Sequence, residues 1–118
     1  MSLNYLFNAM KSAGQTVEVQ YRRGGECLAT LSAIRGKTEE DILDEDTTIN
    51  AVTDDWIVLA ADLVDASQQP IVPKTADRIV LIATGQNFEV LPTRRNGPVY
   101  RKSDPAGKLL RIHTKEVS

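Results

Sequence analysis

Cys27 and His113, the only cysteine and the only histidine in the sequence, could together supply nucleophilic chemistry. A thiol beside an imidazole is a common arrangement for covalent catalysis. No motif links the two residues, and Cys27 lies in a strand-like pattern, where free cysteine usually serves as a small apolar residue. His113 lies on the polar face of another predicted strand. We therefore expect Cys27 to be a small apolar filler in a strand, His113 to be solvent-facing or hydrogen-bonded, and the protein not to be an enzyme.

Acidic residues concentrate in the middle of the chain, where residues 38–73 hold ten acids and no lysine or arginine. Carboxylates suit calcium, but the acid spacing, central glycine and closing glutamate of an EF-hand loop are absent. One cysteine excludes an internal disulfide and a thiolate metal cage. Gly24 and Gly25 are not followed by the residues of a phosphate-binding loop. The sequence predicts no metal site and no cofactor.

Basic residues concentrate after residue 73, with nine bases against four acids in residues 74–118. Tyr100 offers a ring for stacking on a base. The pI of about 5.4 and an aromatic content of 5% nevertheless argue against a nucleic-acid-binding domain. The uneven charge fits either an ordinary solvated surface or complementary patches that meet a partner or another copy. The candidate basic residues are Arg94, Arg95, Arg101, Lys102, Lys108, Arg111 and Lys115.

The elements that must position these charges begin with a predicted amphipathic helix over about residues 3–12. Leu3, Leu6, Phe7 and Met10 share one face of it, and Gly14 is a natural stop. The apolar period then changes from 3.6 to 2, which indicates about seven or eight short strands. The predicted core residues are Val17, Val19, Trp56, Val58, Ile79, Leu81, Phe88, Val90, Leu110 and Ile112.

Two glycine-containing turns predict β-hairpins, one at Gly24 and Gly25 and one at Gly85 and Gln86. Simple two-residue loops fix the pairing in each case. The predicted partners are Arg23 with Glu26, Tyr21 with Leu28, Val19 with Thr30, Ala83 with Phe88, and Leu81 with Val90.

Residues 36–48 are polar, rich in acids and weakly periodic. The segment is too long for a tight turn, and loops of this length are usually functional or disordered. We predict a long, mobile acidic loop. Its acids are Glu39, Glu40, Asp41, Asp44, Glu45 and Asp46.

These patterns predict one mainly β domain over residues 1–118, a small antiparallel β-barrel or sandwich over about 16–115 with a short N-terminal helix. The longest apolar runs, "WIVLAA" and "IVLIA", are too short to cross a bilayer. The N-terminus lacks the pattern of a secretory signal, so we expect an intracellular protein.

The order of these features resembles the small head-completion or head–tail joining proteins of tailed bacteriophages and prophages, which form the neck as adaptor or stopper subunits. The resembling segments are "VEVQYRRGGECLATLSAIRG", "DWIVLAADL", "PKTADRIVLIATGQNFEVLP" and "YRKSDPAGKLLRIHTK". The chain departs from the pattern at Ala76, where glycine is common before the aspartate, and at Phe88, where tyrosine is more frequent.

The resemblance implies a structural virion-assembly protein with no catalytic residues. It implies a β-barrel that forms a ring, commonly of six subunits, around the channel through which DNA passes without sequence-specific binding. The partners would be portal and tail proteins, at the virion neck and, during assembly, in the host cytoplasm. Arg94, Arg95, Arg101 and Lys102 are then candidate assembly contacts, and the acids of residues 39–46 would face the channel. The alternative is a free-standing β-barrel module that binds nucleic acid or a peptide.

Overall fold

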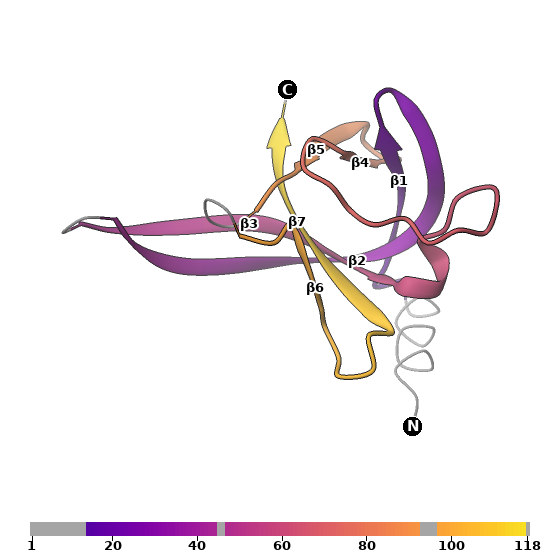
Figure 1. Ribbon diagram of the computed structural model, residues 1–118. Coiled ribbons are helices and arrows are strands. Elements are labelled where there is room, and N and C mark those ends of the chain that lie inside the picture. The colour runs from indigo at the N-terminus through magenta and orange to yellow at the C-terminus, as the bar shows by residue number, and fades with distance from the viewer. Residues whose placement is uncertain (1–13, 45–46, 93–96, 118) are drawn as a thin grey trace.

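The computed structural model describes residues 14–44, 47–92 and 97–117 (Figure 1). For residues 39–44 and 47–51 the description concerns the backbone alone. The predicted helix over about residues 3–12 lies outside the described residues.

The described chain forms a closed antiparallel β-barrel. Six strands follow one another around it in the order β3-β2-β1-β4-β5-β7, and pairing between β3 and β7 closes the circle. The short β6 pairs with β7 on the same side as β5, one after the other along β7. A mainly β fold is confirmed, as a barrel and not a sandwich. The strands are β1 (Val17–Arg23), β2 (Glu26–Asp44), β3 (Thr47–Leu59), β4 (Arg78–Leu81), β5 (Gln86–Val90), β6 (Tyr100–Lys102) and β7 (Leu109–Val117).

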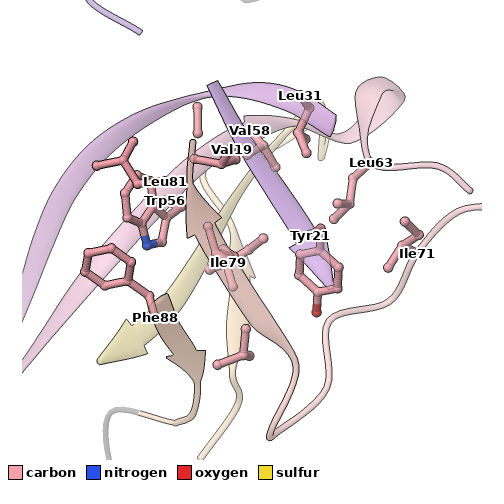
Figure 2. Close-up of a cluster of buried hydrophobic side chains, with 13 residues drawn as sticks. Val19, Tyr21, Leu31, Trp56, Val58, Leu63, Ile71, Ile79, Leu81 and Phe88 are labelled. Atoms are coloured by element: carbon pink, nitrogen blue, oxygen red, sulfur yellow. The ribbon is translucent and has the colours of Figure 1, made fainter. Parts of the chain in front are cut away.

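Trp56 and Phe88 lie together in the buried hydrophobic cluster, and both are fully buried (Figure 2). Their rings meet edge to face with centroids 4.9 Å apart, a favourable aromatic geometry. The indole N–H of Trp56 donates to the hydroxyl of Thr114 at 2.9 Å, so its polar atom is satisfied. The guanidinium of Arg35 lies 5.5 Å from the Trp56 ring and 5.0 Å from the Phe88 ring, where it covers both.

Most of the predicted core residues are buried, with two exceptions. Val17, the first residue of β1, is 37% exposed, and Leu110 is only partly buried. Val17 is the first residue of β1 and Leu110 the second of β7, so both lie near the ends of their strands. Buried hydrophobic residues beyond the predicted set are Tyr21, Leu31, Ala33, Leu59, Leu63 and Ile71.

The first hairpin turns at Gly24 and Gly25, whose φ angles of 58° and 86° need glycine. Arg23 pairs with Glu26 as predicted. A β-bulge then leaves Leu28 without a partner, so that Tyr21 pairs with Ala29 and not with Leu28. For the same reason Val19 pairs with Leu31 and not with Thr30. The predicted pairing was wrong by the one residue that the bulge inserts.

The second hairpin has a four-residue turn over residues 82–85, not a two-residue turn. Leu81 therefore pairs with Gln86 and Ile79 with Phe88, which corrects the predicted partners. The amide of Gly85 donates to the carbonyl of Leu81 at 2.7 Å and closes this longer turn. The pairing slipped by an even number of residues, so the same side chains still face the core.

A mobile loop was predicted over residues 36–48, but its described residues, 36–44 and 47–48, lie in the paired strands β2 and β3, so the loop is not confirmed. Mobility of the segment stays a prediction. The two strands remain paired from Ile34 with Ile57 out to Asp44 with Thr47. The sequence did not indicate these strands, because acidic residues have low strand propensity. A returning segment rich in β-branched residues, "TTINAVT", supplies backbone partners that the propensity of one strand does not reveal. We call residues 37–44 and 47–53 the arm, which projects from the barrel (Figure 1).

Candidate assembly surfaces

The turn between β6 and β7 holds basic side chains in a fixed position. Arg101, Lys102 and Lys108 are exposed, and we call residues 100–110 the basic hairpin. The carboxylate of Asp104 accepts hydrogen bonds from the backbone amides of Leu109 at 2.7 Å and Lys108 at 3.2 Å. These amides, that of Leu109 foremost, hold the pKa of Asp104 below its ordinary value. The turn is therefore stabilised locally, and its only acid is occupied by backbone.

The cations of the basic hairpin have no carboxylate partner among the side chains that the structure describes. The ion pairs found among the described residues join side chains outside the basic hairpin, such as Arg78 with Glu89 at 4.0 Å. Of the predicted basic contacts, Arg101 and Lys102 thus lie together on one exposed edge strand, whereas Arg94 and Arg95 lie outside the described residues.

The acidic positions Glu39, Glu40, Asp41 and Asp44 all lie on the β2 half of the arm. Alternate residues of a strand face opposite sides, so these positions occur on both faces of the ribbon. Glu45 and Asp46 lie outside the described residues. Pairing of β2 with β1 ends at Ala33, and pairing of β3 with β7 begins at Asp54. Within the described chain, both long edges of the arm are therefore unpaired.

At the root of the arm, a buried carboxylate joins three strands. Asp55 is 0% exposed and accepts hydrogen bonds from Thr38, from Thr53 at 2.8 Å and from Arg111 at 3.0 Å. The Nδ1 atom of His113 lies 3.0 Å from Oδ1 of Asp55, the oxygen that also accepts from Thr53. Burial alone would raise the pKa of Asp55, but hydrogen bonds from His113, Thr38 and Thr53 outweigh it and lower the pKa to about 2. The cluster ties β2 and β3 to β7 where the arm leaves the barrel.

His113 and Cys27 differ in how well their environments were predicted. His113 is hydrogen-bonded as expected, but it is 3% exposed and not on an open polar face. Its backbone carbonyl accepts from the amide of Leu91, and its amide donates to the carbonyl of Val99, so these two residues lie beside this part of β7. Cys27 lies in a strand, β2, as expected, but it is exposed and so does not serve as a buried apolar filler. It lies beside the bulge of β2, where the side-chain alternation of the predicted pairing is broken.

A second buried carboxylate, Asp77, fastens β1 to the segment before β4. It accepts hydrogen bonds from the hydroxyl of Tyr21, from Arg23 at 2.8 and 2.9 Å, and from the amide of Lys74 at 3.0 Å. Burial would raise the pKa of Asp77, but the hydrogen bonds from Arg23 and Tyr21 lower it. Burial, together with the neighbouring carboxylate, raises the pKa of Tyr21.

Neither buried cluster was identified from the sequence. The only hint of the Asp77 cluster in the sequence is that Asp77 belongs to "PKTADR", part of a segment that carries the family resemblance. Asp55 had none, because its partner His113 is 58 positions away and meets it only once β3 pairs with β7.

The described residues contain no group of three or more histidine, cysteine, aspartate or glutamate side chains placed to hold a metal ion. No helix within the described ranges is long and apolar enough to cross a membrane. One shallow depression of about 330 Å³ lies beside Arg23, Leu28 and Lys74, away from the basic hairpin.

Comparison with known proteins gives a match along almost the whole chain. The family model described as phage head-tail joining protein matches residues 3–118. No curated protein matches the chain significantly. The matched range includes the barrel, the arm and the basic hairpin, which excludes a match to one isolated motif. The chain thus belongs to the family of phage head-tail joining proteins, and its role is in the assembly of a phage virion.

Proposed function

We propose that the protein is a ring subunit of the phage neck, which connects the portal of the head to the tail around the DNA channel. The observation that carries the proposal is the family match over residues 3–118. The barrel supports it, because a closed sheet gives a rigid body from which two charged projections, the arm and the basic hairpin, can reach neighbours. In this proposal the ring contains six copies.

The partners in this proposal are portal and tail proteins above and below, and identical subunits to either side. DNA passes through the ring without being read in sequence. Ring formation would take place in the host cytoplasm on a filled head. Exposed ion pairs contribute only about 0–1 kcal/mol each. The isolated subunit is therefore expected to be monomeric and to assemble on the portal.

Arg94, Arg95, Arg101 and Lys102 stay the predicted assembly contacts, and a channel-facing role for the acids at 39–46 stays a prediction. The test of the function begins with a phage whose copy of this gene is inactivated and restored from a plasmid. Without the protein we expect heads and tails to accumulate unjoined or heads to lose their DNA. Electron microscopy of the lysate measures both outcomes.

The Arg94→Glu, Arg95→Glu variant makes the test specific. It should fold with an unchanged thermal transition, because neither position was part of the predicted core, yet it should not restore joined particles. Normal particles from this variant would remove the two arginines from the assembly contacts.

A nucleic-acid-binding module is the second candidate, favoured by the exposed cations of the basic hairpin. Tight binding of the wild-type protein to duplex DNA, with a steep dependence on salt, would support it. Normal particle assembly without the protein would support it further.

A further inference from the structure

From the placement of charge in the fold, we propose that the arm of each subunit docks on the basic hairpin of the next copy in the ring. The inference rests on the proposed ring and identifies the contact that builds it. The partner that the arm contacts is a second copy of this chain.

The arm and the basic hairpin lie at opposite ends of β3. Leu59, the last residue of β3, pairs with Leu109, and the next amide, that of Ala60, donates to the carbonyl of Lys108 at 2.8 Å. Thr47, the first residue of β3, belongs to the arm. A strand of 13 residues spans roughly 40 Å at about 3.3 Å per residue. Figure 1 shows the two projections leaving the barrel in different directions, so the arm of one chain does not reach its own hairpin.

The two projections carry opposite charge. The described residues of the arm contain four acids and one base, Lys37, for a net charge of −3. The basic hairpin contains three bases and one acid, Asp104, for a net charge of +2. The carboxylate of Asp104 is held by backbone amides, so it does not neutralise its neighbours. The negative arm of one copy is therefore complementary in charge to the positive basic hairpin of another copy. Within one copy the two projections lie too far apart to meet.

Unpaired strand edges and apolar positions on the arm also favour contact with another chain. A two-stranded ribbon is at best marginally stable in water, and unpaired strand edges favour contact with another chain. Ile42 pairs with Ile49, and Val52 is 43% exposed, so apolar positions lie along the ribbon. An arm extended freely into a channel would leave these positions and both edges in water. An arm laid on a neighbouring subunit would cover them.

β7 connects the two contact surfaces rigidly within each subunit. Arg111 pairs with Arg101 of the basic hairpin, and its guanidinium binds Asp55 at the root of the arm at 3.0 Å. A head-to-tail contact closes into a ring only if the rotation per subunit is fixed. The Asp55 cluster sets the angle between arm and hairpin and so provides this condition.

Cross-linking in purified tailed particles tests the contact directly. In a Cys27→Ser background, which removes the only cysteine, we would introduce Thr48→Cys on the arm and Ser103→Cys on the basic hairpin. Mild oxidation should convert most of the protein into a ladder of dimers and larger species. The matched control replaces Ser67, which is exposed on a different loop, in place of Ser103, and should remain monomeric.

Each outcome distinguishes the inference from the function on which it rests. Absence of the wild-type protein from tailed particles would contradict both. Its presence without cross-links above the control would overturn the arm contact alone. Dimers of the Thr48→Cys variant without Ser103→Cys would mean that arms converge on the axis, which is the channel-facing alternative.

Charge reversal gives a second, independent test in the same phage. One variant reverses the arm, another reverses the hairpin, and a third combines both sets. Either set alone should abolish joined particles, because like charges would then face each other, and the combined variant should restore them. Failure of the combined variant to restore joining, while it folds normally, would contradict the contact. The substitutions are Glu39→Lys, Glu40→Lys and Asp41→Lys in the arm, and Arg101→Glu, Lys102→Glu and Lys108→Glu in the hairpin.

Discussion

At the scale of single residues, two buried carboxylates fasten segments that the strand ladder alone leaves apart. Asp77 joins β1 to the loop before β4, and Asp55 joins the arm to β7. A buried charge is tolerated only where it is paired and hydrogen-bonded, and both are. Removal of one partner from such a cluster costs more than removal of an exposed charge.

Asp55→Asn should destabilise the protein at neutral pH and lose its effect in acid. The pKa of Asp55 falls from an ordinary 3.8 to about 2 on folding. The ionised carboxylate therefore contributes about 2 kcal/mol, present in full above the unfolded-state pKa and lost as pH falls towards the folded-state pKa. Chemical denaturation of wild type and variant from neutral pH down to about pH 2 measures the difference.

The difference in unfolding free energy between wild type and Asp55→Asn should shrink across that acidic window. Asp62→Asn, at an exposed position just after β3, is the matched control and should change stability little. A difference that stays constant down to the lowest pH would contradict the role assigned to Asp55.

Ala76→Gly should stabilise the fold. Ala76 has a φ of 76°, a left-handed conformation that costs a residue with a Cβ about 1–2 kcal/mol. Glycine removes that strain but gains entropy in the unfolded chain, which leaves a net gain of up to about 1 kcal/mol. The midpoint of denaturant unfolding measures the gain.

The matched control for Ala76 is Ala83→Gly, in the exposed turn before β5 and without a positive φ. It should be neutral or destabilising, since only the entropic cost applies there. Equal gains at both positions would show that backbone strain at Ala76 is not the cause.

At the scale of elements, the second hairpin places the ring of Phe88 against Trp56 in the hydrophobic core. Phe88→Ala should lower the free energy of unfolding by about 3–5 kcal/mol, because a fully buried ring leaves a cavity. Val72→Ala, at a position 53% exposed, should change it by less than about 0.5 kcal/mol. Similar losses for the two variants would place Phe88 outside the core.

The arm should show partial, alternating protection from hydrogen exchange in the isolated subunit. Residues of a two-stranded antiparallel ribbon alternate between amides that bond across the pair and amides that face outwards. The paired amides should be protected, but less than those of β1 at Val19 and Tyr21, because the arm opens locally. Uniformly rapid exchange over residues 37–44 would instead support the mobile loop that the sequence suggested.

The hairpins show why the sequence predicted elements better than their pairing. Alternation of apolar residues identified Ile79, Leu81, Phe88 and Val90 as core, and it is insensitive to an even slip. The bulge at Leu28 and the turn over residues 82–85 are decided by local backbone geometry, which alternation does not encode. The strands of the arm were not predicted, because they stabilise each other through backbone pairing that the composition of neither segment indicates.

At the scale of the whole molecule, the family and the barrel were within reach of the sequence, and the placement of charge was not. The uneven distribution of acids and bases was visible, and it suggested complementary patches. Their location at opposite ends of β3 depends on the pairing of β3 with β7, between residues that are far apart in the chain. The same pairing brings Asp55 to Arg111 and His113.

The central claim is that this chain forms a ring in the phage neck, and an electron cryomicroscopy reconstruction of the neck of purified tailed particles tests it most directly. We expect a ring of this barrel between portal and tail, with each arm lying on the next subunit. Particles that are joined and filled but contain no such ring, or that carry this barrel elsewhere, would contradict it.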